Sequence, residues 1–306
     1  MGNIRLVDGN SVGRAAHAGV KLSAGGIQTQ AIFNVIKGAR AWLMSAPDFT
    51  PLVLWDGRAQ WRYDLHPDYK SKRNDTPEKI KDREEYKKQA PHIIRAMSAL
   101  GIRQMMASDR EADDLAGSLV TMTQARDPLA KVLLTTGDED WLQLLRDGVT
   151  WEDHRDATKK INLNNLFERT GFRTPYLFLE GKCLQGDTSD DIPGVGGIGA
   201  KKAPEFIAEF GSVREFWRRV DAGEFVPKYA IHKRLASAEG RASFARNLQM
   251  MQLIKPMPMK RDLTTVYPAK FDRKEFEDIC AEFAFVSIRR DMDNFLIPFM
   301  RQQEGK

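Results

Sequence analysis

Cysteine is nearly absent from this sequence: Cys183 and Cys280 are the two that occur among 306 residues, and they lie far apart. Their spacing matches neither a zinc site nor a disulfide framework, so we interpret them as thiols in a reducing compartment. Any bound metal would then have oxygen ligands. No apolar run approaches the roughly 18 residues that a membrane span needs, and the opening MGNIRL lacks the apolar core of a signal peptide. We therefore expect a soluble intracellular protein, in the cytoplasm, with no membrane partner.

The motifs of several enzyme classes are missing as well. GVGGIGAKKA (194–203) lacks the spacing of the P-loop G-x-x-x-x-G-K-[ST], which argues against nucleoside triphosphate chemistry. The five histidines are scattered, so packing or surface roles explain them better than a nucleophilic triad. The net charge of +5 agrees with an anionic partner and equally with ordinary solubility. The distribution of the charges is more informative than their sum.

Acidic residues recur where short apolar runs end in the first half of the chain. IRLVD ends in Asp8, PLVLWD ends in Asp56, and KVLLTTGDED supplies Asp138 and Asp140. A further apolar run, GIRQMMAS, precedes EADD at 111–114. These runs alternate with amphipathic stretches, which predicts an α/β domain with a largely parallel sheet. Because the carboxyl ends of parallel strands meet at one edge, we expect the acids to converge there.

The acids form the main candidate site. Each alone is explained by a turn or a helix start, but so many carboxylates at one edge would repel one another unless cations were present. Within EADD, Glu111 and Asp114 would share a helical face, and Asp187 and Asp190 are a helical turn apart. Hard oxygen ligands select Mg²⁺ or Mn²⁺, and two such ions about 4 Å apart suit an in-line displacement at phosphorus. The predicted metal ligands are Asp8, Asp56, Glu111, Asp113, Asp114, Asp138, Asp140, Asp187 and Asp190.

The segment from about 57 to 92 is polar, charged and punctuated by Pro67 and Pro77, so we expect it to leave the sheet as an arch over the acidic edge. Its basic runs, 58–73 and 79–88, contain aromatic residues, which offer stacking surfaces for bases beside cations for phosphates. A solvated helical face explains 79–88 equally well. From about 173 onward strand signals fade, and we expect a helical domain.

A glycine-rich stretch follows the last two acids of the set. It predicts a tight turn between helices, in which backbone N–H groups and two lysines cradle a phosphate. An ordinary helix corner that needs glycine for packing is the alternative. The predicted binding residues are Gly194, Gly196, Gly197, Gly199, Lys201 and Lys202.

Five segments in this order resemble one family. They are LVDGNSVGRAAHA, WDG followed by LHPDYKSKR, EADDLAGSLV, TTGDEDWLQLL and GDTSDDIPGVGGIGAKKA. Together they resemble the 5′ nucleases, meaning flap endonucleases and 5′-3′ exonucleases, including the N-terminal nuclease region of bacterial DNA polymerase I. The resemblance implies a resolvase-like (PIN-like) α/β core at 1–172 with an arch at about 57–92. It also implies a helical 5′-3′ exonuclease C-terminal domain at 173–306. In that domain a helix-three-turn-helix element, of the helix-hairpin-helix type, at about 186–203 would grip duplex DNA and hold K⁺.

The resemblance also implies roles for individual residues. Asp187 and Asp190 would belong to the second metal position, and the other seven acids mostly to the first. The family pattern Tyr-Lys-x-x-Arg matches Tyr69, Lys70 and Arg73. Lys70 and Arg73 would stabilise charge on the scissile phosphate, because a preorganised cation favours developing negative charge, and Tyr69 would stack on a nearby base.

These implications define the expected function: a Mg²⁺-dependent or Mn²⁺-dependent 5′-3′ exonuclease and 5′-flap endonuclease with a two-metal mechanism, serving DNA replication and repair. Its partner would be duplex DNA with a 5′ end or flap, or an RNA–DNA hybrid. No polymerase region follows, so we expect a free-standing nuclease of the kind that viruses and some bacteria carry, acting in the host cytoplasm if viral. Two alternatives stay open: a non-catalytic protein that binds branched DNA, and a PIN-like ribonuclease.

Overall fold

A computed structural model describes residues 2–255 and 258–304. Within them, one sheet has the strand order β8-β7-β6-β1-β4-β5-β9. The five central strands run parallel, and β8 and β9 pair antiparallel at the two edges. The predicted α/β fold with a mainly parallel sheet is confirmed. The strands are β1 (Ile4–Asp8), β4 (Thr50–Trp55), β5 (Arg103–Ala107), β6 (Val132–Thr136), β7 (Val149–Asp153), β8 (Asp156–Ile161) and β9 (Thr264–Tyr267), with a separate small hairpin of β2 (Ser23–Ala24) and β3 (Ile27–Gln28).

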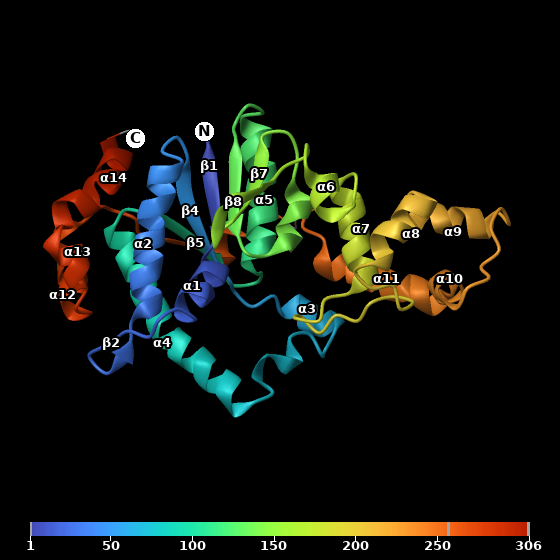
Figure 1. The fold of residues 1–306 in the computed structure, drawn as a ribbon, viewed down its shortest axis with the longest axis horizontal. Coiled ribbons are helices and arrows are strands. Elements are labelled where there is room, and N and C mark those ends of the chain that lie inside the picture. Colours follow the sequence, from blue (N-terminus) through green and yellow to red (C-terminus); the bar gives the residue numbers. More distant parts are fainter. Residues whose placement is uncertain (1, 256–257, 305–306) are drawn as a thin grey trace.

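Both faces of the sheet are buried, because successive residues of a strand point to opposite sides. In β1, Leu6 joins one apolar cluster and Val7 the other, and in β4 Leu54 and Val53 divide in the same way. The helices α1 (Gly9–His17), α2 (Gln30–Ser45) and α4 (Pro77–Ala99) contribute to the cluster of Val7, and α5 (Ala112–Arg126) contributes to that of Leu6. Figure 1 shows α2 and α5 on opposite sides of the strands.

The connection between β4 and β5 leaves the sheet, as expected for the segment 57–92. It consists of α3 (Gln60–Leu65), the short 3₁₀ helix η1 (Ser71–Asn74) and α4. Thr76 caps α4 by accepting from the Lys79 N–H, and Pro77 fits the first helical position, where no donor is needed. In Figure 1 the chain passes through α3 into the first half of α4, which projects below the strand ends, so that the segment forms an arch.

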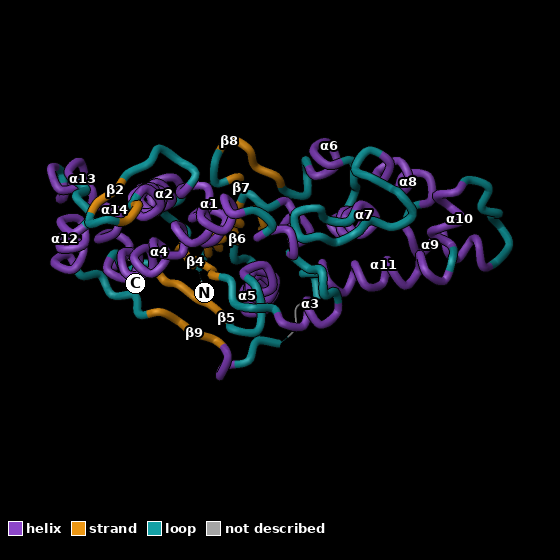
Figure 2. The backbone as a smooth tube through the Cα atoms, turned by 90° about the horizontal axis from the view of Figure 1, so that it is seen from below, coloured by secondary structure: helices purple, strands orange, loops and turns teal. Residues whose placement is uncertain are grey.

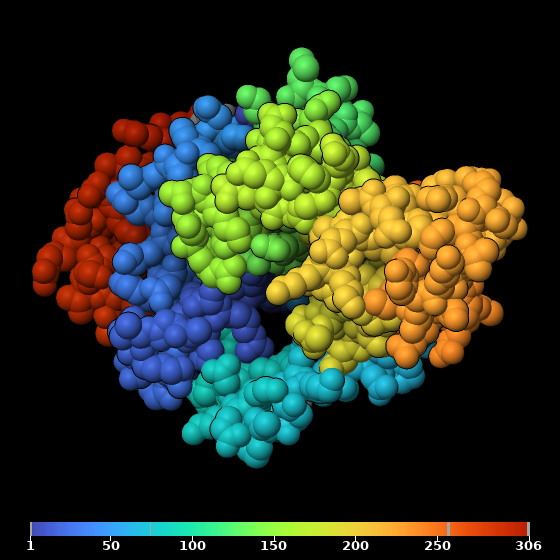
Figure 3. Space-filling model, turned by 45° about the vertical axis from the view of Figure 1, so that its right-hand side comes forward, coloured from blue at the N-terminus to red at the C-terminus, as the bar shows by residue number. Residues whose placement is uncertain are grey.

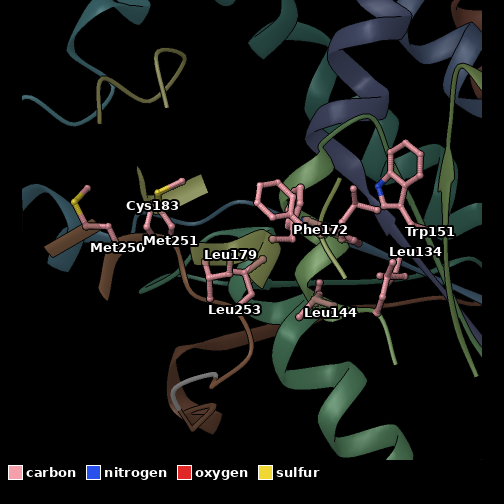
Figure 4. Close-up of a cluster of buried hydrophobic side chains, with 14 of the residues drawn as sticks. Leu134, Leu144, Trp151, Phe172, Leu179, Cys183, Met250, Met251 and Leu253 are labelled. Atoms are coloured by element: carbon pink, nitrogen blue, oxygen red, sulfur yellow. The ribbon is translucent and has the colours of Figure 1, made fainter. Parts of the chain in front are cut away.

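The second half begins as a helical domain made of α6 (Leu166–Thr170), α7 (Pro175–Gln185), α8 (Lys202–Phe210), α9 (Val213–Asp221), α10 (Ala230–Ala236) and α11 (Ala238–Met251). One continuous apolar cluster joins it to the sheet. Figure 4 shows this junction, where Leu134 and Trp151 of the strands, Leu179 and Cys183 of α7, and Met251 of α11 belong to the same core. Shared close packing fixes how α7 and the chain that follows it sit against the sheet.

The last part of the chain differs from our expectation of one helical domain from 173 to 306. Residues after the 3₁₀ helix η3 (Arg261–Leu263) return to the α/β core: β9 pairs with β5, and α12 (Arg273–Glu282), α13 (Val286–Arg290) and α14 (Met292–Glu304) follow it. Phe276 and Leu296 pack in the same cluster as Ile93 of α4. Figure 2 shows β9 as the outer strand of the sheet. A four-residue edge strand that is largely exposed lacks the apolar alternation by which sequence reveals a strand. None of the described helices has the length and apolar character needed to cross a membrane.

Candidate active site

A cavity of about 1740 Å³ opens at the carboxyl ends of the parallel strands. Its walls come from α1, the arch, the start of α5, the 3₁₀ helix η2 (Glu139–Leu144) and the turn after α7. Figure 3 shows the hollow between the teal arch, the blue N-terminal segment and the yellow-green residues after α7. Eight of the nine predicted acids line it: Asp8, Asp56, Glu111, Asp113, Asp138, Asp140, Asp187 and Asp190.

The strand ends place the first of these carboxylates. Asp8 is the last residue of β1 and also caps α1, accepting from the Ser11 N–H at 2.9 Å and from the Thr136 hydroxyl at 2.9 Å. Asp56 follows β4 and accepts from the Ala112 N–H at 2.8 Å, which ties it to the start of α5. Each side chain is therefore held by a neighbouring strand or helix as well as by its own.

Asp113 and Asp138 complete a group that we call the unpaired carboxylates, namely Asp8, Asp56, Asp113 and Asp138. The Trp141 indole N–H donates to Asp113 at 2.7 Å, and the Asp140 N–H donates to Asp138 at 2.8 Å. In the described part of the chain, no ion pair with Lys or Arg neutralises any of the four. They receive neutral hydrogen bonds and otherwise face one another.

Burial and mutual repulsion raise the pKa values of the unpaired carboxylates. Burial and then the charge of Asp56 raise the pKa of Asp8 to about 6. Burial and then Asp140 raise the pKa of Asp138 to about 7. Burial and the charges of Asp138 and Asp8 raise the pKa of Asp113 well above its usual value. Asp138 is open to water in the cavity, which weakens the effect there, whereas Asp8 is 6% exposed. The unpaired carboxylates are therefore stabilised either by binding protons or by binding added cations.

Three other acids of the cavity have protein cations beside them, and we call Glu111, Asp140 and Asp190 the paired carboxylates. Glu111 contacts the Lys70 ammonium, Asp190 contacts Arg73 at 2.6 Å, and Asp140 contacts Lys182 at 2.9 Å. Burial disfavours the charge of Glu111, but Lys70 and Arg62 outweigh it and lower the pKa of Glu111. Glu111 is therefore held in its ionised form, whereas burial raises the pKa of Asp140 although Lys182 lies beside it.

Lys70 and Arg73 line the cavity, as the resemblance implied. Lys70 has a left-handed backbone (φ 58°), and its N–H donates to the Asp190 carbonyl at 3.0 Å. Tyr69 differs from the expectation. It is 2% exposed, and its hydroxyl lies 2.8 Å from Glu111 and 3.0 Å from Asp190. A ring enclosed in this way cannot stack on a base; in this structure Tyr69 holds two carboxylates in place.

Asp114 is the one predicted ligand that does not reach the cavity. Its two oxygens contact Arg62 at 2.7 Å each, and it accepts from the Glu111 N–H at 3.0 Å. Glu111 and Asp114 do converge as expected, since one Arg62 nitrogen lies 3.4 Å from Glu111 and 2.7 Å from Asp114. They differ in that Glu111, the N-cap of α5, also lines the cavity, whereas Asp114 does not.

Asp187 and Asp190 both line the cavity, but they do not lie on a helix. The Asp187 N–H donates to the Ile192 carbonyl and the Ile192 N–H to the Asp187 carbonyl, both at 2.8 Å, which closes a tight turn. The Ser189 N–H and hydroxyl each donate to Asp187 at 2.7 Å. Together with Lys182 these bonds lower the pKa of Asp187 despite its burial.

Sequence reasoning did not select Lys182. It lies on α7 and brings a cation into the cavity beside Asp140. A lone lysine in a helix carries no local signal, and packing of α7 against η2 gives it this position. Arg14 of α1 was also missed; its guanidinium lies 4.4 Å from the centre of the Tyr86 ring on the arch helix.

The glycine-rich turn connects α7 with α8, as predicted. Gly196 and Gly197 have positive φ angles of 69° and 81°, a conformation that favours glycine. A Cβ atom on Gly194 would lie 2.5 Å from the Gln185 carbonyl oxygen, so that position requires close backbone approach. Gly199 has open space around it, and Lys201 and Lys202 are exposed.

The donor set fits hard divalent cations, since it consists of carboxylate oxygens, several of which have raised pKa values. Over the described residues, however, no three His, Cys, Asp or Glu side chains already stand close enough to form a metal-binding group. The residues available to hold an ion are therefore present but spread.

Comparison with known proteins gives two family matches that together span most of the chain. The 5′-3′ exonuclease N-terminal resolvase-like domain matches residues 3–171, and the 5′-3′ exonuclease C-terminal SAM fold matches residues 173–274. DNA polymerase I of Mycobacterium tuberculosis is 30% identical over 298 residues, which are 94% of this chain and 31% of that protein. DNA polymerase I of Lactococcus lactis is 30% identical over 226 residues, 71% of this chain and 25% of that protein. The chain thus spans between a quarter and a third of the length of these relatives.

Solved structures share the fold. The bacteriophage T5 D15 flap endonuclease in a complex with DNA and metal ions superposes with a TM-score of 0.69, at 21% identity and 99% coverage of both chains. Human GEN1 in complex with Holliday junction DNA gives a TM-score of 0.59 at 15% identity, covering 92% of this chain and 68% of that one. The family matches to the resolvase-like core and to the helical domain after it, together with the identity to the polymerase relatives, show that the chain belongs to the 5′-3′ exonuclease family.

Proposed function

We propose that this protein is a divalent-metal-dependent nuclease that hydrolyses DNA phosphodiester bonds near a free 5′ end, as a 5′-3′ exonuclease and 5′-flap endonuclease. One observation carries the proposal: eight carboxylates from separate parts of the chain and two arch-base cations, Lys70 and Arg73, line the same cavity. A concentrated set of acids can bind metal ions, and fixed cations beside these acids can hold a phosphate group against the ions.

The carboxylates divide into two candidate metal positions. The unpaired carboxylates would hold one Mg²⁺ or Mn²⁺ ion, and Asp187 with Asp190 would hold a second, while Glu111 and Asp140 lie beside Lys70 and Lys182. When bound, such ions supply an activated water and charge stabilisation at phosphorus. Asp114 is removed from the proposed ligands, since both of its oxygens face Arg62.

The arch base would bind and orient the phosphate. Lys70 and Arg73 are anchored by Glu111 and Asp190, so they are held in one position and lose little freedom when an anion arrives. A cation fixed next to the reacting phosphate stabilises negative charge that develops during hydrolysis. Tyr69 would act through the two carboxylates that its hydroxyl contacts.

The glycine-rich turn would bind the duplex away from the cut. Its backbone approaches closely at Gly194, has left-handed residues at Gly196 and Gly197, and is followed by exposed Lys201 and Lys202. Turns of this kind present N–H groups to phosphates, and carbonyls on the same turn can hold K⁺. The structures of T5 D15, Rad2 and GEN1 that resemble this chain are complexes with DNA, which supports DNA as the partner.

A labelled 5′-flap duplex tests the proposal. We expect cleavage near the base of the flap with Mg²⁺ and none with EDTA. Asp187→Ala should abolish cleavage while leaving duplex binding within about twofold, because phosphate contacts and not this acid carry the affinity. Asp278→Ala on α12, far from the cavity, is the matched control.

The same assay tests the two alternative functions. Binding of the flap duplex without cleavage by the wild type would favour a non-catalytic protein that binds branched DNA. Faster cleavage of a matched RNA strand would favour a ribonuclease, and an RNA–DNA hybrid is tested as the third substrate.

A further inference from the structure

Arg62 is a buried cation at the arch base to which nothing above assigns a part in the reaction. It lies on α3 and is 3% exposed, although arginine rarely occurs in protein interiors. The Trp61 ring covers one side of the guanidinium, whose central carbon lies 4.5 Å from the ring centre. A buried charge persists only where its hydrogen bonds are made, so its partners show what it does.

Those partners come from two parts of the fold outside the arch. The terminal nitrogens of Arg62 donate to both oxygens of Asp114 at 2.7 Å. The Nε–H donates at 3.0 Å to the Met250 carbonyl, which belongs to the last turn of α11, where carbonyls lack partners within the helix. One side chain therefore links the arch, the start of α5 and the helical domain.

Asp114 passes this link on to the cavity. The oxygen that accepts from Arg62 also accepts from the Glu111 N–H at 3.0 Å, so the carboxylate fixes the first turn of α5. That turn carries Glu111, which contacts Lys70 and Tyr69, and Asp113, which is one of the unpaired carboxylates. A displacement of the turn would move two acids of the cavity and the partner of Lys70 together.

From this chain of contacts we propose that Arg62 is a positioning residue: through Asp114 it sets the start of α5, so that Glu111 and Asp113 meet a divalent cation at the correct separation. The inference rests on the proposed function. Arg62 touches neither the substrate nor the reacting atoms. Lysine cannot replace it, because a single ammonium does not reach both Asp114 oxygens and the Met250 carbonyl in one plane.

Two measurements on Arg62→Lys test this positioning role. Residues that orient metal ligands typically change metal affinity or rate by 10 to 100-fold, so we expect Mn²⁺ alone, titrated calorimetrically, to bind about tenfold more weakly. The single-turnover rate on the 5′-flap duplex should fall by about 10 to 100-fold, with duplex affinity within about twofold. Arg273→Lys, which alters an exposed arginine paired with Glu277 and Asp293 on the far side of the sheet, is the control and should change neither quantity.

A second variant separates positioning from mere stability. In Arg62→Met/Asp114→Leu an apolar pair replaces the buried ion pair, which often restores folding. We expect a melting temperature near that of the wild type, with Mn²⁺ binding and cleavage still impaired, because the Glu111 N–H has lost its carboxylate. Wild-type Mn²⁺ affinity and rate in either folded variant would overturn the inference. If the wild type binds Mn²⁺ and cuts no DNA, the proposed function fails and the Mn²⁺ comparison still decides the role of Arg62.

Discussion

The unpaired and the paired carboxylates line the same cavity but differ in what neutralises them. Asp8 and Asp138 have pKa values raised to about 6 and about 7, and besides burial the largest cause for each is the charge of another acid. Glu111 has a lowered pKa, because Lys70 and Arg62 face it. The first group is built to receive positive charge, and the second already has it. Under the proposed function, the sheet edge would bind divalent cations, whereas the arch base supplies cations of its own.

The largest expected effect comes from removing one unpaired charge. Asp113→Asn keeps the acceptor for the Trp141 indole N–H but removes a ligand charge, so we expect the cleavage rate to fall by on the order of 10³-fold. Without metal, the same change should raise the free energy of unfolding by about 1 kcal/mol, because it relieves repulsion. Stopped-flow cleavage and urea unfolding in EDTA measure the two quantities.

Glu111→Gln is the corresponding substitution among the paired carboxylates. It leaves Lys70 and Arg62 facing a neutral group, so the free energy of unfolding should fall by about 1 to 3 kcal/mol. Opposite signs for Asp113→Asn and Glu111→Gln confirm that the two groups differ. Equal signs would show that the distinction drawn from the ion pairs has no energetic meaning.

The next largest effect is expected from the removal of Lys70, one of the two arch-base cations. Lys70→Ala should slow single-turnover hydrolysis by about 10²-fold, since a preorganised electrostatic donor is removed. Duplex affinity should change little, because binding depends on many phosphate contacts. An unchanged rate would remove Lys70 from the catalytic residues and leave it as a counter-charge for Glu111.

Metal addition should stabilise the protein in a pH-dependent way. The pKa of Asp8 rises from 3.8 to about 6 on folding, so between these values the folded protein binds more protons than the unfolded chain, and metal-free stability falls as pH rises. At pH 8, above the pKa values of both Asp8 and Asp138, these two carboxylates are ionised and free to bind Mg²⁺. At 100 times its dissociation constant, Mg²⁺ should add about 2.7 kcal/mol at pH 8 and less at pH 5.5. Calorimetric melting at both pH values measures this; a larger increase at pH 5.5 would contradict it.

The smallest effect concerns the glycine-rich turn, whose Lys201 does not line the cavity. Lys201→Ala should weaken duplex binding a few-fold, equally for all sequences, and reduce the slope of log affinity against log salt by about 1. The single-turnover rate at saturating DNA should stay the same. A changed rate with unchanged salt dependence would mean that the turn acts on the cavity and not on the backbone of the duplex.

The fold and much of the site were predictable from local pattern. Apolar runs that end in Asp8 and Asp56 gave the parallel strands and the edge at which the acids meet, because strand direction fixes where the last side chain lies. The edge strand β9 was not predictable, since it is short and largely exposed. Neither was the turn at Asp187, where backbone bonds to Ile192 replace the helix that the spacing suggested.

The sequence by itself determined which residues bring negative charge to the sheet edge and which glycines allow the turn after α7, because strand ends and left-handed backbone are local properties. Tertiary structure alone decided which acids remain unpaired. Asp113 and Asp114 are neighbours in the chain, yet one faces the cavity and the other faces Arg62. The packing of α3, α5 and α11 decides which charged side chains come into contact. The electrostatic energy of each contact depends on distance and burial, and the order of residues in the sequence specifies neither.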